Sequence, residues 1–261
     1  MKYGFIGCGN MGGAIAKALS KATKDIAITD RSGKAKSLAK ELGCQYTDAQ
    51  TIATNCERIF LAVKPQMMES VLYPLREILS TQKPLIITMA AGLTTDRIEA
   101  MCGTSLPVLR IMPNTPVIVG KGMIPYCCNR LVDSIVLESV LEDLRFAGKM
   151  DALDEELMDA STALSGSGPA YMYLFLEALA DSAIACGLPG DKALVYAAMT
   201  MAGAAEMAIT SGKDPGVLKD AVCSPGGSTI EGINALEENG FRETIAACVR
   251  AAYHKNIELG K

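Results

Sequence analysis

One histidine occurs among the 261 residues, His254, and it stands in a charged, helix-like stretch near the end of the chain. A triad hydrolase holds a histidine between a nucleophile and a carboxylate, and the residues around His254 do not supply that arrangement. The nine cysteines include no C-x-x-C pair, so a zinc site has no support and we expect no metal. The single histidine and the absence of C-x-x-C pairs therefore disfavour a triad hydrolase and a zinc enzyme. We expect His254 to lie on the surface.

The composition also limits where the protein acts and what it binds. The cysteine count is odd and no signal peptide opens the sequence, so we expect reduced thiols in a cytoplasmic protein. The net charge is −4 and no run rich in Lys or Arg occurs, so we expect no nucleic-acid partner. The most apolar stretch, residues 170–186, is interrupted by Glu177 and Asp181. It is shorter than the roughly 20 residues of a membrane span, and we expect no membrane partner.

Short apolar runs alternate with helix-like segments over the first 150 residues. The runs that predict buried strands are residues 2–7, 25–30, 58–63, 84–89 and 106–112. The segments between them with helical spacing are residues 11–19, 35–43, 67–79 and 95–101. Strands that alternate with helices form a parallel sheet covered on both faces. We therefore predict an α/β fold with an N-terminal, doubly wound, Rossmann-like sheet domain.

The pattern changes near residue 150, and no further strand is predicted. The expected helices are residues 154–166, 169–186, 191–210, 215–222 and 229–240, separated by glycine and proline. This pattern predicts a Rossmann domain over residues 1–150 and an all-helical domain over residues 151–261. Two of these helices are apolar nearly all round and must be buried on several sides. A second copy of the chain is expected to cover them; the alternative is a compact monomeric bundle.

A glycine-rich turn follows the first predicted strand. Gly7, Gly9 and Gly12 match G-x-G-x-x-G between a strand and a helix, which is the context that makes this motif informative. In a dinucleotide site the first glycine permits the turn, the second admits the pyrophosphate, and the third allows close helix packing. The alternative is a tight strand-to-helix turn with no ligand.

The end of the second predicted strand gives conflicting signals about the dinucleotide. Asp30 stands 18 residues after Gly12 (30 − 12 = 18), where an acidic side chain holds the ribose 2′-OH of NAD. Arg31 and Ser32 follow, and they can hold the 2′-phosphate of NADP. Both NADH and NADPH therefore stay open. A flavin is less favoured, because no additional flavin-binding element is evident.

A second glycine turn lies in the helical half, in the stretch VCSPGGSTIE. Ser228 and Glu231 have the spacing of a capping box, which predicts a helix start with a side-chain cap. The flexible Pro-Gly-Gly just before it also suits close approach of a ligand to the backbone. A Gly-Ser segment at residues 164–169 is expected to open another helix.

Six blocks along the chain resemble the pyrroline-5-carboxylate reductase family, which performs the last step of proline synthesis. The blocks are FIGCGNMG (5–12), LAVKPQ (61–66), MAAG (89–92), RIMPNTP (110–116), LSGSGPAY (164–171) and LKDAVCSPGGSTIEGI (218–233). The resemblance implies a Rossmann domain followed by a helical domain that interlocks with a partner's, and some members form larger rings of dimers.

The resemblance also implies which residues hold the ligands. The positions that match the substrate carboxylate loop are Ser224, Pro225, Gly226, Gly227, Ser228 and Thr229. Thr162 matches a threonine near the substrate nitrogen. The positions that match cofactor-binding residues are Ile6, Gly7, Cys8, Gly9, Asn10, Met11, Ala62, Val63, Lys64, Pro65, Met89, Ala90, Ala91, Asn114 and Glu155. Asp30 departs from the serine or asparagine common in NADP-using members.

The implied reaction moves a hydride from the nicotinamide to C5 of a cyclic imine. A protonated imine accepts hydride readily, so the protein has mainly to position the two rings. Two alternatives stay open: a related two-domain dehydrogenase or imine reductase acting on another small acid, with Lys64 as a proton donor, or a dinucleotide sensor without catalysis.

Overall fold

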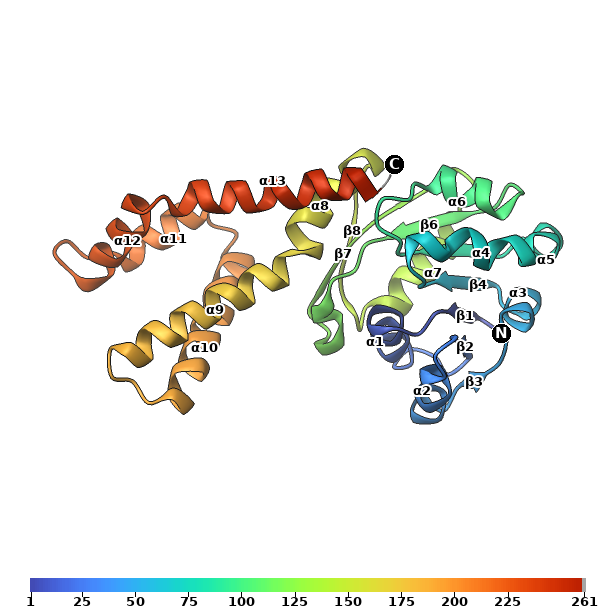
Figure 1. The fold of residues 1–261 in the computed structure, drawn as a ribbon, viewed down its shortest axis with the longest axis horizontal. Coiled ribbons are helices and arrows are strands. Elements are labelled where there is room, and N and C mark those ends of the chain that lie inside the picture. Colours follow the sequence, from blue (N-terminus) through green and yellow to red (C-terminus); the bar gives the residue numbers. More distant parts are fainter. Residues whose placement is uncertain (260–261) are drawn as a thin grey trace. The chain divides into compact units, whose positions relative to one another are not determined.

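The computed structural model describes residues 1–259, and the chain forms two compact units. The first unit contains residues 1–167 and the segment that begins at Ala252, and the second contains residues 168–251 (Figure 1). The predicted boundary at residue 150 instead falls inside a strand, Gly148–Ala152. Side chains just after this strand, Glu155 and Asp159, pair with Arg110 of the sheet, which attaches the following segment to the first unit.

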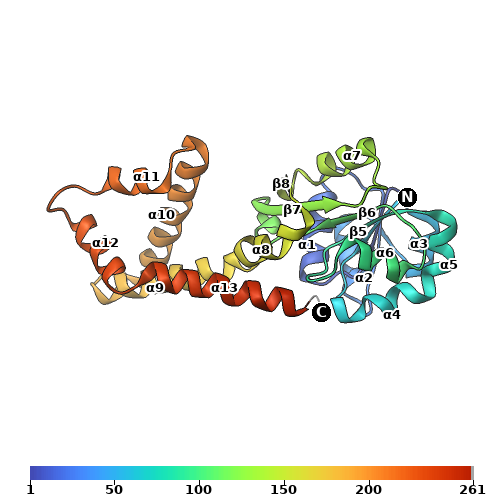
Figure 2. The ribbon, with the colours of Figure 1, turned by 90° about the horizontal axis from the view of Figure 1, so that it is seen from above.

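The first unit is built on a single sheet of eight strands. They are β1 (Tyr3–Ile6), β2 (Ile26–Thr29), β3 (Gln45–Tyr46), β4 (Arg58–Leu61), β5 (Leu85–Thr88), β6 (Val108–Ile111), β7 (Gly122–Cys128) and β8 (Gly148–Ala152). Their order is β3-β2-β1-β4-β5-β6-β7-β8, and all neighbours are parallel except β6 and β7 (Figures 1 and 2). The six strands from β3 to β6 have the Rossmann order. The five predicted strands and the Rossmann-like fold are confirmed.

Helices cover both faces of this sheet. They are α1 (Asn10–Leu19), α2 (Lys34–Leu42), α3 (Ala49–Asn55), α4 (Met68–Leu72), α5 (Arg76–Gln82), α6 (Thr95–Cys102), α7 (Ser134–Leu144) and α8 (Met158–Ser161). One core cluster packs α1, α2 and α7 against the sheet. A second core cluster packs α3, α4, α5 and α6 against the sheet. Every residue of β1, β4, β5 and β6 is buried, as expected for strands covered on both faces.

The single helix predicted over residues 67–79 is wrong. Proline at position 74 has no backbone N–H, and a helix cannot pass through it undisturbed. The structure has α4, a 3₁₀ turn over Tyr73–Leu75 and α5 in its place.

The second unit is entirely helical. Its elements are α9 (Gly168–Ala185), α10 (Gly190–Ser211), α11 (Pro215–Val222), α12 (Ser228–Glu238) and the greater part of α13 (Phe241–Leu259). Helices α9 and α10 pack on each other, yet each has one buried residue, Ala180 and Ala193 respectively. Many of their other apolar side chains are exposed and the rest are only partly buried in the described chain, contrary to the alternative of a compact monomeric bundle.

Helix α10 meets the length and composition of a membrane span, and among the described helices it alone does so. This is weak grounds for a membrane location, because a helix buried by protein can have the same length and composition.

Candidate active site

The first glycine turn is sterically restricted at two of its three glycines and open at the third. Gly7 has a φ of +102°, and a Cβ atom there would lie 2.6 Å from the carbonyl oxygen of Ala62. A Cβ at Gly12 would lie 2.5 Å from the carbonyl oxygen of Gly7. A Cβ at Gly9 would meet no atom within 4 Å. The turn is therefore tight at Gly7, closely packed at Gly12 and open at Gly9.

Helix α1 presents an uncapped N-terminus at this opening. Its N-cap residue is Gly9, no side chain caps it, and its first turn contains no acidic residue. The free N–H groups and the positive end of the helix dipole suit a bound anion. Gly9 and Asn10 are exposed, so the opening is reachable from solvent. The geometry fits the pyrophosphate of a dinucleotide.

Most of the other predicted cofactor residues follow the carboxyl ends of neighbouring strands. The backbone N–H of Gly7 donates to Thr29 at 2.9 Å and that of Ala62 donates to Ile6 at 2.9 Å, which joins the ends of β1, β2 and β4. The segments 62–65 and 89–91 follow β4 and β5, and Asn114 comes shortly after β6. The structure therefore brings these segments together at the carboxyl ends of the parallel strands. Ligands of open α/β sheets bind at these strand ends.

Asp30 lies at the same edge, directly after β2. Its Oδ2 accepts a hydrogen bond from Ser32 Oγ at 2.7 Å. Its Oδ1 is buried and has no hydrogen-bond partner among residues 1–259. Burial, together with the nearby Asp30 carboxylate, raises the pKa of the Cys8 thiol to about 12. Cys8 is therefore a neutral thiol at physiological pH, and Asp30 lies close to the glycine turn.

The side chains of two predicted cofactor residues, Asn114 and Glu155, bond to other segments of the first unit. Asn114 Nδ2 donates to the carbonyl oxygen of Ser165 at 2.9 Å, and Asn114 Oδ1 accepts from the Met123 N–H at 3.0 Å. Glu155 accepts from the N–H and the hydroxyl of Thr95, both at 2.8 Å, and pairs with Arg110 at 3.2 Å. Their predicted contacts with the cofactor stay predictions, while their observed contacts position the surrounding backbone.

Arg110 is a buried cation that the sequence analysis did not single out. Its side chain lies between Glu155 at 3.2 Å and Asp159 at 3.5 Å. The available signal was an arginine inside the apolar strand LPVLRIM, because such a charge requires a partner. Arg110 and Glu155 together fix the segment that leads to Thr162.

Thr162 is nine-tenths buried in an unusual stretch of helix. Residues Thr162–Gly166 form a π-helix, a rare conformation that is frequent at functional sites. The Thr162 hydroxyl donates to the carbonyl oxygen of Met158 at 2.6 Å. Because its one proton is used there, the oxygen is left to accept a hydrogen bond from another group. The Gly-Ser segment at residues 164–169 thus begins as π-helix, and α9 starts within it, at Gly168, as predicted.

The second glycine turn lies in the second unit, between α11 and α12. Gly226 has a φ of +69°, and the Gly227 N–H donates to the carbonyl oxygen of Ser224 at 3.0 Å. The predicted capping box is wrong. The N-cap residue is Gly227, no side chain caps the helix, and Ser228 is its first helical residue. The turn Ser224–Thr229 therefore leaves the N–H groups of the first turn of α12 without a side-chain acceptor.

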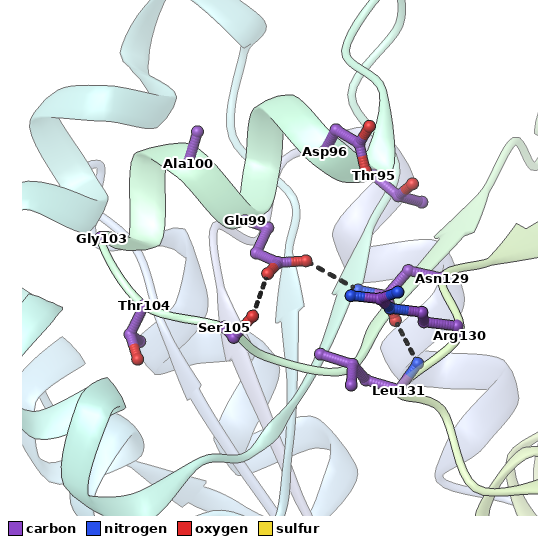
Figure 3. A pocket seen from close by; sticks show the side chains of 10 residues that line it. All are labelled: Thr95, Asp96, Glu99, Ala100, Gly103, Thr104, Ser105, Asn129, Arg130 and Leu131. Atoms are coloured by element: carbon purple, nitrogen blue, oxygen red, sulfur yellow. Dashed lines mark hydrogen bonds between the residues drawn. The ribbon is translucent and has the colours of Figure 1, made fainter.

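A cavity of about 660 Å³ lies elsewhere on the first unit, between α6 and the loop that follows β7 (Figure 3). In it Glu99 accepts hydrogen bonds from Ser105 and Asn129. The lining also includes the acidic Asp96, and neither of the two glycine turns is part of it. No three metal-ligating side chains gather here or elsewhere in residues 1–259.

Comparison with known proteins decides the family. Residues 155–259 match the family model described as pyrroline-5-carboxylate reductase dimerisation, and residues 2–92 match one described as NADP oxidoreductase, coenzyme F420-dependent. The pyrroline-5-carboxylate reductase of Escherichia coli (strain K12) is 37% identical over 266 residues, which cover 100% of this chain and 98% of the relative. This chain belongs to the pyrroline-5-carboxylate reductase family.

Other members of the pyrroline-5-carboxylate reductase family are also similar to this chain over nearly its whole length. The Pisum sativum enzyme is 38% identical over 98% of this chain and 95% of its own. The crystal structure of the Plasmodium falciparum enzyme, solved with NADP bound, is 34% identical with a TM-score of 0.90 over 100% of this chain and 98% of that chain. The resemblance carried by the six sequence blocks is confirmed.

Proposed function

We propose that the chain reduces 1-pyrroline-5-carboxylate to L-proline with a hydride from NADH or NADPH. The observation that carries this proposal is the match to pyrroline-5-carboxylate reductases over the full chain. The two uncapped glycine turns support it, because the reaction needs one anion site for a pyrophosphate and one for a carboxylate. The alternatives of a related dehydrogenase and a sensor have no comparable support.

The first unit contains a site that fits the dinucleotide. Gly7 to Gly12 and the start of α1 would hold the pyrophosphate, and Asp30 would meet the adenosine ribose. The segments 62–65 and 89–91 would line the rest of the cofactor. When bound, the nicotinamide supplies the hydride, and the residues around it have only to bind and orient.

The turn Ser224–Thr229 would hold the substrate carboxylate. The first backbone N–H groups of α12 have no side-chain acceptor, and Gly226 and Gly227 leave the backbone open. Such a helix start attracts an anion through its N–H groups and its dipole. A carboxylate fixed in this way orients the attached ring and selects substrates that resemble amino acids.

Thr162 would accept a hydrogen bond from the substrate nitrogen. A protonated imine carries an N–H, and the product amine carries one as well. The Thr162 oxygen has accepting capacity left because its own proton is bound to Met158. The side chain is 8% exposed, so this contact would form in a largely dry environment, where it is stronger.

Replacement of Thr162 by valine is expected to lower kcat for pyrroline-5-carboxylate about 10- to 100-fold, the range of one hydrogen bond to a charged group. Thr162→Ser retains the oxygen and is expected to recover most of the activity. Initial rates of NADH and NADPH oxidation, followed by absorbance, give kcat and KM for each variant. Thr54→Val, at an exposed position of α3, is the matched control and is expected to behave as the unmodified chain. Full activity in Thr162→Val would refute the role, and no turnover by the folded, unmodified chain would refute the function.

We further propose that the functional protein is a homodimer built through the second unit. The exposed apolar side chains of α9 and α10 need a cover, and the matched family model over residues 155–259 describes dimerisation. The nine cysteines are all free thiols, which agrees with the proposed cytoplasmic location.

A further inference from the structure

We infer that Asp30 makes this chain select NADH over NADPH. The inference rests on the proposed dinucleotide site and adds the identity of the nucleotide. Asp30 has one carboxylate oxygen, Oδ1, that is buried without a hydrogen-bond partner among residues 1–259. An unsatisfied buried acceptor is rare in a folded protein, and a ligand that donates to it is one of the ordinary explanations.

The position of Asp30 shows which ligand group would donate. It follows β2 directly, next to the strand β1 that carries the glycine turn, and its charge acts on Cys8 within that turn. In dinucleotide folds an acidic residue at this place accepts from the 2′-OH of the adenosine ribose. NADH has that hydroxyl, whereas NADPH has a phosphate ester in its place.

A 2′-phosphate would meet Asp30 unfavourably. Its oxygens are acceptors and cannot satisfy Oδ1, and its negative charge would lie near a carboxylate that is partly shielded from water. Like charges at short range repel each other more strongly where solvent is excluded.

The two neighbouring side chains that could hold a 2′-phosphate do not offset this repulsion. The Ser32 hydroxyl donates its one proton to Asp30 Oδ2 at 2.7 Å. The Arg31 guanidinium is exposed and lies 3.1 Å from the Met67 sulfur, and an exposed charge is screened by salt. On these contacts we resolve the conflict left by the sequence in favour of Asp30.

The test is titration calorimetry of the folded chain with NAD⁺ and with NADP⁺, in parallel with kcat/KM for the two reduced forms. We expect the unmodified chain to bind NAD⁺ at least about tenfold more tightly, the effect of one charge-assisted hydrogen bond. Asp30→Ser removes the charge, and we expect it to lose about tenfold in NAD⁺ affinity and to gain in NADP⁺ affinity. Glu57→Gln removes an exposed charge just before β4, at the opposite edge of the sheet, and is expected to leave the ratio of the two affinities unchanged.

Equal or tighter binding of NADP⁺ by the unmodified chain would overturn the inference about Asp30 and leave the proposed reductase intact. An unchanged affinity ratio in a folded Asp30→Ser variant would overturn it as well. If the folded chain bound neither dinucleotide, the proposed function itself would fall. Should Asp30→Ser fail to fold, the affinity ratio of the unmodified chain still decides the question.

Discussion

Replacement of Gly12 by alanine is expected to weaken dinucleotide binding at least about 100-fold, whereas the same replacement at Gly13 is expected to preserve it. The added methyl at Gly12 would lie 2.5 Å from the Gly7 carbonyl oxygen and 2.7 Å from the Ala62 Cβ. Neither neighbour is a flexible side-chain end, so α1 must move away from the turn or the turn must deform. Overpacking of this kind typically costs about 1–3 kcal/mol of stability. It also displaces the N–H groups that would meet the pyrophosphate.

Gly13 is the matched control for this prediction. The nearest atom to a Cβ there is Leu38 Cδ2 at 3.5 Å, an ordinary van der Waals distance. Alanine is favoured over glycine inside a helix by about 1 kcal/mol, so Gly13→Ala is expected to be neutral or slightly stabilising. Calorimetric titration with NAD⁺ and NADP⁺ and thermal unfolding of both variants give the comparison. Equal affinity in the two variants would contradict the steric account of the turn.

Introduction of a carboxylate on the apolar surface of α9 and α10 is expected to separate the proposed dimer. Met199 on α10 is 68% exposed in the single chain and Leu174 on α9 is 67% exposed, so each is free to meet a partner. Burial of an unpaired charge in an interface costs several kcal/mol. A cost of about 4 kcal/mol raises the dissociation constant about a thousandfold. Met199→Asp and Leu174→Asp are therefore expected to yield monomer or aggregate with little reductase activity.

Light scattering coupled to size-exclusion chromatography measures this outcome. Ile135 on α7 is the matched control, since it is an apolar residue of the first unit that is 75% exposed. Ile135→Asp is expected to leave the dimer intact. If both α9 and α10 variants remained dimers with full activity, the surface would not be the interface.

The sequence predicted the elements whose local chemistry determines their structure. β1 and the turn after it were predictable because a buried apolar run and three glycines leave few alternatives. β3 has two exposed residues and β8 is partly exposed, so neither shows the apolar run of a covered strand. β7 contains Pro125, which weakens a strand signal. These strands depend on pairing with neighbours that the local sequence does not reveal.

The sequence predicted which segments form the candidate site, but it did not predict most of the side-chain contacts within it. The glycine turns were found, but the capping box was wrong because the helix begins one residue earlier than the serine pattern indicated. The contacts of Glu155 with Thr95 and of Asn114 with Ser165 join residues 60 and 51 positions apart. Such contacts are decided by tertiary packing, which the spacing of residues along the chain does not report.

The most direct test of the account is to follow the hydride. The folded chain is mixed with pyrroline-5-carboxylate and, in parallel samples, with NADH or NADPH that carries deuterium at C4 in the transferred position, and the proline formed is examined by mass spectrometry and NMR. The account predicts L-proline with one deuterium at C5. Absence of proline, or proline without deuterium at C5, would contradict it.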